Sequence, residues 1–242
     1  MSEDVLVLCY HAVSPDWEAT MAVTPEALRE QLTALASRGY RGATFREAVL
    51  DPPAGRTVAV TFDDSYRSVA ELGRPILDEL GWPATVFVPT AYAGAEEPRG
   101  WDGTDHWLST PHARELTPMS WAKLAGLRDA GWEIGSHTST HPHLTECDDD
   151  RLAAELRGSK ADCERELGAP CETLAYPYGD HDGRVVAAAA DSGYAAAAAL
   201  PGRAGRRPEL HAYPRVGVWS NTGALRFRLK ASPLVRRLRA TT

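Results

Sequence analysis

Two adjacent carboxylates end an apolar run in the stretch VAVTFDDSY, residues 58–66. The apolar run itself, residues 58–62, predicts a buried strand. Neighbouring acids repel each other, and burying either one costs several kcal/mol unless it is paired or bound to a metal. Asp63 and Asp64 are therefore candidates for a metal ligand and a general base. The structural alternative is that both acids cap the helix predicted in SYRSVAEL.

Two histidines, His137 and His141, lie four residues apart in the stretch SHTSTH. On a helical turn this spacing places both imidazoles on one face, where they can share a metal. The pair alone is a weak signal, because a metal site needs a third ligand, which Asp63 or Asp64 can supply. Two histidines and one carboxylate leave coordination positions open for water and substrate. The other aspartate could then act as a general base toward that water.

Strand-like and helix-like stretches alternate along the chain and must position these residues. The predicted strands are residues 5–11, 57–62, 84–89, 132–137, 173–177, 194–200 and 215–219. The predicted helices are residues 24–39, 67–81, 117–131, 148–168 and 183–193. Seven or so βα units without a linker-like break predict one domain with a parallel barrel. An open, doubly wound sheet is the alternative.

Functional residues of parallel α/β folds collect at the carboxyl ends of the strands. The candidates of this chain all follow or adjoin predicted strands: His11, Asp63, Asp64, His137, His141, Tyr178 and Arg215. One long irregular segment, residues 90–116, is rich in Gly, Pro, Trp and His and is a candidate lid or substrate loop. We expect Trp101, Trp107 and Trp219 to fill gaps in the core or lid, rather than to stack on sugar rings.

Composition sets limits on the class of protein. The 242 residues are 43% hydrophobic and 24% charged, as in a soluble globular domain, and contain no apolar run of about 18 residues that would span a membrane. The start, MSEDVLVLCYH, lacks the features of a signal peptide, so we expect a cytoplasmic protein. The four cysteines show no CxxC pairing, which predicts reduced thiols: Cys9, Cys147, Cys163 and Cys171.

Charge is unevenly distributed along the chain, whose net charge is −7. From Arg203 onward there are ten basic residues and one acid, Glu209. The tail at about 224–242 combines this charge with Leu, Phe and Val. We interpret it as a solvated terminal helix or frayed tail, with weak peripheral contact to an anionic surface as the functional alternative. Nucleic-acid binding is not expected, because no recognisable module accompanies the charge.

Three ordered motifs, TFDDSY, SHTSTH and AYPYG, give the chain a specific resemblance between Tyr10 and about Trp219. It resembles the NodB-homology polysaccharide deacetylases, the family-four carbohydrate esterases. The resemblance implies a distorted (β/α)7 barrel as a single domain over residues 1–242. It also implies that Asp63 is the catalytic base and that the backbone N–H of Tyr178 contributes to an oxyanion hole. Asp64, His137 and His141 would hold one divalent metal, with zinc favoured over cobalt, nickel and iron.

The chain also departs from the common family pattern. Ala175 stands where many members have arginine, Ser65 replaces the usual glycine, and no late Leu-x-His motif supplies a general acid. The early YH and the AYPYG motif resemble the poly-N-acetylglucosamine deacetylase subgroup. That likeness implies that His11 is the acid and that Arg215 tunes the base. The alternatives are a plain strand-end histidine and a simple ion-pair partner.

The resemblance implies a metal-dependent hydrolase that removes N-acetyl groups from N-acetylated amino sugars and releases acetate. Its substrate would be a carbohydrate or glycoconjugate. A related amidase or deformylase acting on another amide is the first alternative. A non-catalytic glycan-binding protein is the second, and the intact set of metal-binding residue types argues against it. The particular glycan and the oligomeric state are not predicted.

Overall fold

Parallel strand pairing organises the fold. The computed structural model describes residues 4–200 and 209–239. Within these ranges the main sheet has the strand order β10-β9-β8-β7-β6-β5-β1-β11, and β4 pairs with β5 outside this path. Its strands are β1 (Asp4–Tyr10), β4 (Tyr40–Ala43), β5 (Arg56–Phe62), β6 (Thr85–Val88), β7 (Glu133–Ser136), β8 (Thr173–Ala175), β9 (Ala196–Ala199), β10 (Tyr213–Pro214) and β11 (Val216–Gly217). A separate small sheet joins β2 (Ala12–Val13) to β3 (Ala22–Val23).

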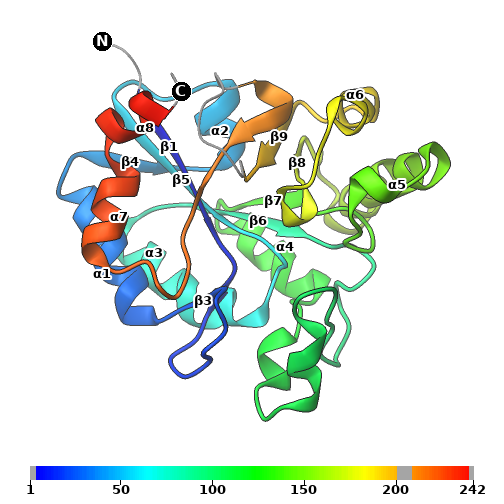
Figure 1. The fold of residues 1–242 in the computed structure, drawn as a ribbon, viewed down its shortest axis with the longest axis horizontal. Coiled ribbons are helices and arrows are strands. Elements are labelled where there is room, and N and C mark those ends of the chain that lie inside the picture. The colour runs from blue at the N-terminus through cyan, green and yellow to red at the C-terminus, as the bar shows by residue number, and fades with distance from the viewer. Residues whose placement is uncertain (1–3, 201–208, 240–242) are drawn as a thin grey trace.

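The two ends of the main sheet meet in one short segment. β10 pairs with β9, β11 pairs with β1, and only Arg215 separates β10 from β11. This segment therefore nearly closes the sheet into a barrel, as Figure 1 shows. The predicted single-domain barrel is confirmed, and the alternative of an open, doubly wound sheet is wrong.

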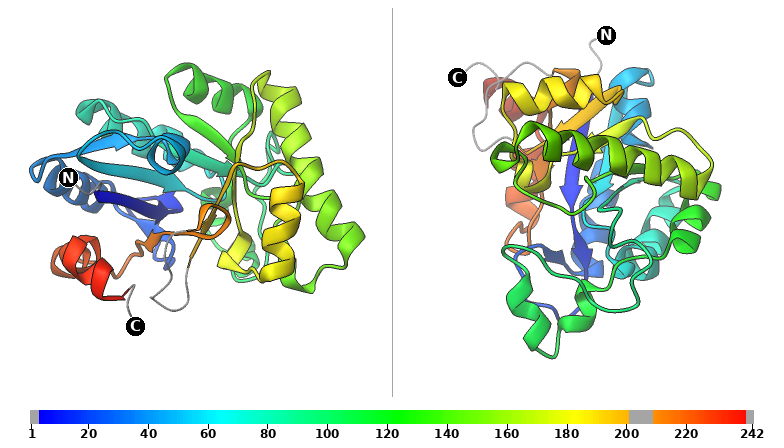
Figure 2. Two further views of the ribbon diagram at one scale, coloured as in Figure 1. Left: turned by 90° about the horizontal axis from the view of Figure 1, so that it is seen from above. Right: turned by 90° about the vertical axis from the view of Figure 1, so that its right-hand side faces the viewer.

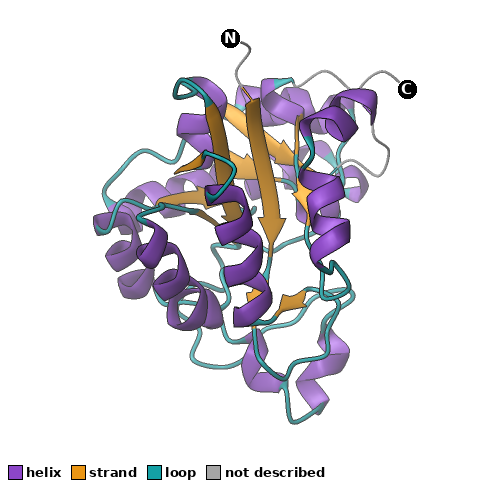
Figure 3. Cartoon of the chain, turned by 90° about the vertical axis from the view of Figure 1, so that its left-hand side faces the viewer, coloured by secondary structure: helices purple, strands orange, loops and turns teal. Residues whose placement is uncertain are grey.

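Helices surround the strands on the outside (Figures 2 and 3). They are α1 (Pro25–Ala36), α2 (Phe45–Leu50), α3 (Arg74–Leu80), α4 (Trp121–Asp129), α5 (Asp149–Leu167), α6 (Gly183–Asp191), α7 (Ala224–Ala231) and α8 (Pro233–Arg239). Local chemistry sets the starts of five of them, because a side-chain oxygen of the N-cap residue accepts a hydrogen bond from a backbone N–H of the first turn. These N-cap residues are Thr24, Thr44, Ser120, Asp148 and Asp182. The predicted helix 67–81 contains a π-helical stretch, Val69–Gly73, before α3.

Small side chains fill the narrow barrel interior around two phenylalanines. Phe45 and Phe87 pack there with Ala196 and Ala198 of β9, whereas Ala197 and Ala199 belong to the cluster between the sheet and the outer helices. A Cβ on Gly135 would lie 2.6 Å from the Phe87 ring. The alanine-rich stretch is a strand, as predicted. Its inward side chains are small because larger ones would not fit beside these rings.

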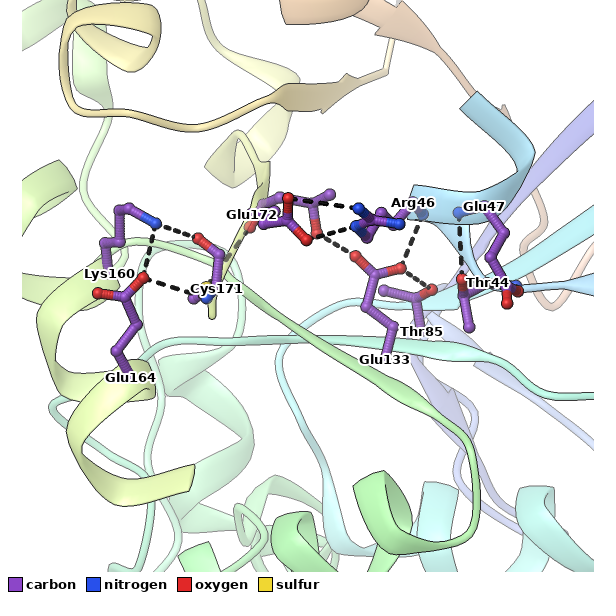
Figure 4. Close-up of polar contacts among 10 residues, drawn as sticks. Thr44, Arg46, Glu47, Thr85, Glu133, Lys160, Glu164, Cys171 and Glu172 are labelled. Carbon is purple, nitrogen blue, oxygen red and sulfur yellow. Dashed lines mark hydrogen bonds and ion pairs between the residues drawn. The ribbon is translucent and has the colours of Figure 1, made fainter. Parts of the chain in front are cut away.

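The amino-terminal end of the barrel is closed by elements that the sequence analysis did not predict, β4 and α2. Helix α2 starts with a capping box at Thr44 and inserts Phe45 into the interior. The Glu133 carboxylate accepts hydrogen bonds from the Thr85 hydroxyl (2.8 Å), the Arg46 backbone N–H (2.9 Å) and the Thr173 hydroxyl (Figure 4). This half-buried carboxylate therefore has three hydrogen-bond donors around it.

The segments with special predictions have defined structures. Residues 90–116 form an irregular excursion with two 3₁₀ turns, Asp105–Ser109 and Ala113–Leu116, as expected for a loop (green, lower right in Figure 1). The basic tail forms α7 and α8, while residues 240–242 lie outside the described residues. The four cysteines are buried and unbridged.

Across the described ranges, no helix combines the length and the apolar character that a bilayer span requires.

Candidate active site

The residues singled out from the sequence come together in one cleft at the carboxyl ends of the strands. Asp63 and Asp64 follow β5, His11 follows β1, and the loop with His137 and His141 follows β7. The cleft is lined by all seven predicted residues: His11, Asp63, Asp64, His137, His141, Tyr178 and Arg215. Elements far apart in the sequence therefore deliver acids, imidazoles and a guanidinium to one place.

Three of these residues form a compact donor set. The Nε2 atoms of His137 and His141 lie 3.5 Å and 3.3 Å from the same Asp64 oxygen, Oδ1. These distances exceed the ~2.7–2.9 Å of a charge-assisted hydrogen bond. A tetrahedral cation bound at about 2.0–2.1 Å would hold its donors about 3.3–3.4 Å apart. The spacing of these three atoms fits a shared cation better than it fits hydrogen bonds.

Protonation states in the set suit metal binding. The Nδ1 atom of His137 lies 2.8 Å from the Ala175 carbonyl, so Nδ1 carries the proton and Nε2 presents its lone pair toward Asp64. Burial lowers the pKa of His137 and lowers the pKa of His141 to about 3. Within the described residues Asp64 Oδ1 is buried without a hydrogen-bond partner. Two neutral imidazoles and one unpaired carboxylate oxygen are a suitable donor set for a divalent metal.

The backbone that holds the donor set differs from the sequence expectation. His137 and His141 lie in an irregular loop, not on a helical turn, so the predicted spacing argument is wrong although the pairing is right. All non-glycine residues with positive φ in the described ranges lie in the loops around the cleft: Asp64, Ser65, Thr138, His141 and Tyr178, with φ between 52° and 69°. Such conformations cost free energy and persist where the surroundings enforce them.

Asp63 and Arg215 form a buried, bidentate ion pair. Nη1 of Arg215 lies 2.7 Å from Oδ1 of Asp63, and Nη2 lies 2.8 Å from Oδ2. The Cys9 thiol also contacts Oδ2, at 3.4 Å. Burial alone would raise the pKa of Asp63, but the Arg215 guanidinium outweighs this effect and holds the pKa well below its usual range. Asp63 is therefore ionised. Both of its oxygens face Arg215 and not the start of a helix, so the helix-cap interpretation of the two aspartates is not borne out.

His11 lies beside this pair. Its ring stacks on Trp219 with a centroid distance of 5.1 Å, and its Nδ1 has no hydrogen-bond partner among the described residues. Burial lowers the pKa of His11, and the carboxylates of Asp64 and Asp63 oppose that shift. His11 is thus a neutral imidazole next to two acids, which favour its protonation.

Aromatic rings form the wall of the cleft. Tyr178 is partly exposed, and its ring stacks on His143 at a centroid distance of 3.9 Å. Trp101 packs on His141 at 4.4 Å and on Tyr66 at 6.2 Å. Trp101 thus packs on the cleft wall and also lines the cleft itself. His143 lies outside the donor set and supports Tyr178.

Comparison with known protein families assigns the chain. A family model described as polysaccharide deacetylase matches residues 51–197, which is more than half of the sequence.

The chain belongs to the polysaccharide deacetylase family. Among its relatives, the Bacillus subtilis protein YxkH is 25% identical over 218 residues, covering 88% of this chain and 70% of YxkH. The poly-β-1,6-N-acetyl-D-glucosamine N-deacetylase of Staphylococcus aureus (strain MRSA252) is 25% identical over 170 residues, covering 65% of this chain. That match spans 54% of the staphylococcal protein, about half of its length.

Solved structures show the same fold as this chain. The Streptococcus pyogenes deacetylase PplD, solved with acetate, has a TM-score of 0.77 at 22% identity, covering 95% of this chain and 98% of PplD. IcaB from Ammonifex degensii has a TM-score of 0.71 at 23% identity, covering 99% of this chain and 98% of IcaB. These likenesses support the barrel.

Helix α5 supports the loop that carries His137 and His141 through a residue that the sequence analysis missed. Oε2 of Glu155 accepts hydrogen bonds from the backbone N–H groups of Ser139 (2.9 Å) and Thr140 (2.8 Å), and the Thr140 hydroxyl donates to Oε1 at 2.5 Å. Glu155 is buried. One carboxylate thus ties down the two residues that directly precede His141.

We expect Glu155→Gln to weaken metal binding roughly 10–100-fold, the usual loss when a group that orients a ligand is changed. The glutamine offers one acceptor oxygen and turns an NH₂ toward a loop that presents donors. Metal affinity measured by competition with a chromophoric chelator tests this. Glu166→Gln, an exposed change on the same helix, is the matched control. A lower melting temperature with unchanged metal affinity would contradict the assignment.

Proposed function

We propose that the chain is a metal-dependent hydrolase that removes N-acetyl groups from N-acetylated amino sugars in a glycan or glycoconjugate and releases acetate. The observation that carries the proposal is the buried set of Asp64, His137 and His141, with the ionised Asp63 beside it. Support for the substrate class comes from the family and from the staphylococcal relative, whose name states a poly-N-acetylglucosamine substrate.

Asp64, His137 and His141 would hold the cation. Bound there, a divalent metal would polarise the acetyl carbonyl and lower the pKa of a water molecule. Two imidazoles and one carboxylate suit zinc, and cobalt, nickel and iron accept the same donors. The open side of the set faces the cleft, so substrate has access to it.

The remaining residues divide the proton transfers. Asp63 accepts a proton from the attacking water, and Arg215 holds the carboxylate ionised and fixed in orientation. The backbone N–H of Tyr178, set by a left-handed φ of 59°, would stabilise the oxyanion that forms on the carbonyl oxygen of the acetyl group. His11, once protonated, would give its proton to the departing amine. The carboxylates beside His11 favour its protonated form during turnover.

Other functions stay open at the level of substrate. A related amidase or deformylase would use the same groups on another amide, and the segment 90–116 would set that choice through Trp101 and its neighbours at the cleft. A non-catalytic glycan-binding protein is the less favoured alternative, because glycan binding alone requires neither a buried ionised Asp63 nor strained loops around a donor set.

Acetate release from N-acetylglucosamine oligomers tests the proposal. We expect protein stripped with a chelator to be inactive, and stoichiometric zinc or cobalt to restore release. Release of formate from N-formyl oligomers, at a higher kcat/KM than acetate release, would favour the deformylase alternative. If one equivalent of metal binds and neither product forms on any acylated amino sugar, the proposed function is wrong.

A further inference from the structure

Helix α7 presents an apolar face to solvent. Leu225 and Leu229 are 73% and 54% exposed, and their spacing of four residues places them side by side on the helix. The opposite face carries Phe227 and Ala231, which are buried in the main core cluster. The leucines are therefore not exposed because α7 fails to pack, since its other side is buried in the core.

Helix α8 carries a third exposed leucine. It follows α7 after Ser232, contacts it, and carries Leu234 with 68% exposure. Exposed large hydrophobic side chains are few in the described residues, and three of the seven are on these two short helices. A cluster of this kind usually marks a site of interaction. We call Leu225, Leu229 and Leu234 the leucine surface.

Basic residues border the leucine surface. Arg226 and Arg228 are exposed and lie about 80° to either side of the midpoint between the two leucines around α7. Residues 224–239 contain six basic residues and no acid, whereas the whole chain carries −7. Apolar side chains bordered by arginines match the boundary of an anionic bilayer, where leucines enter the acyl region and guanidinium groups remain among the phosphates.

We propose that the leucine surface docks the protein on an anionic lipid surface, in the plane of the interface and without crossing it. A second copy of the chain is a poorer occupant. In a two-fold contact the same face meets itself, so Arg226 and Arg228 of one copy would approach the same arginines of the other and repel them. Anionic headgroups instead satisfy both the leucines and the arginines.

The leucine surface lies close in sequence to a residue of the cleft. Residues 220–223 alone separate Trp219, which stacks on His11, from the start of α7. The Thr222 carbonyl also accepts a hydrogen bond from Gln31, which fixes this connection to α1. The inference does not depend on the proposed chemistry, because lipid binding can be measured without any substrate.

Sedimentation of the full chain with vesicles tests the inference. We expect binding to vesicles that contain phosphatidylglycerol and little binding to phosphatidylcholine alone. The double variant Leu225→Ser/Leu229→Ser should reduce partitioning at least about tenfold, and Arg226→Gln/Arg228→Gln should reduce it roughly tenfold at low salt. Leu72→Ser/Leu108→Ser, which removes two exposed leucines elsewhere, should bind like the parent.

Three results would overturn the inference. The first is an absence of binding to phosphatidylglycerol vesicles at low salt. The second is equal binding by the parent and the Leu225→Ser/Leu229→Ser variant. The third is a concentration-dependent dimer that this variant abolishes, without any vesicle binding, which would assign the leucine surface to a second copy. Acetate release from soluble oligomers should be the same in the parent and in this variant, so a failure of docking and a failure of the proposed function give different results.

Discussion

Replacing Asp63 with asparagine should lower kcat by roughly 10²–10⁴-fold, the contribution typical of a general base, while metal binding persists. The reason is geometric. Asp63 faces Arg215 through both of its oxygens, whereas the two histidine Nε2 atoms face Asp64. Removing the charge of Asp63 therefore removes the proton acceptor without removing a metal donor. Acetate release and metal content, measured on the same preparation, provide the test.

His137→Ala is the matched comparison for that experiment. It removes one donor of the set, so both metal binding and turnover should be lost. Thermal unfolding of each variant controls for damage to the fold, because Asp63→Asn leaves the Arg215 guanidinium without its counter-charge. Equal loss of metal from Asp63→Asn and His137→Ala would show that the two aspartates do not divide the roles as proposed.

Arg215→Met should lower the free energy of unfolding by about 3–5 kcal/mol at neutral pH, because it leaves a buried carboxylate unpaired. Both side chains of the pair are almost fully buried, so solvent does not screen the loss. Urea unfolding of metal-free protein measures the effect. The double variant Asp63→Asn/Arg215→Met should recover much of the lost stability, since it buries no charge. Additive losses in the two single variants and the double variant would contradict this coupling.

The same pair predicts a dependence on pH with a definite sign. In the parent protein the pKa of folded Asp63 lies below its unfolded value, so the pair stabilises the fold above the usual aspartate range, and that stability is lost as pH falls through the folded pKa. Without Arg215, burial raises the folded pKa, and the stability of the variant falls as pH rises above the unfolded value. The difference between parent and Arg215→Met should therefore grow from pH 4 to pH 7.

Much of the fold was predictable because its signals are local. Apolar runs that end in polar residues marked most barrel strands, and the residues at their carboxyl ends proved to share one cleft. β4 and α2 were missed because four and six residues are too few to show periodicity. Tertiary contacts explain their residue types, because Phe45 fills the barrel end and Gly42 leaves room for Trp82.

Some residues of the candidate site were likewise predictable from the sequence, and others were not. Residue types and order were enough to select Asp64, His137 and His141, although the local geometry expected for the two histidines was wrong. Glu155 gave no signal, because on a long helix rich in acids and bases it is one charged residue among many. Its contact with the loop depends on how α5 packs beside β7. Cys9 was similarly hidden within an apolar strand, where only the pairing of β1 with β5 places its thiol near Asp63.

The segment that closes the barrel also has a consequence for the order in which the candidate active site is assembled. The proposed base, Asp63, and the residues proposed to hold a metal have all left the ribosome once residue 141 emerges, whereas Arg215 lies between β10 and β11. A growing chain thus carries a full set of metal donors long before it carries the counter-charge of its base. Closure of the barrel brings Arg215 to Asp63 and so keeps this carboxylate ionised. A product truncated before Arg215 could therefore take up metal but would have no catalytic activity.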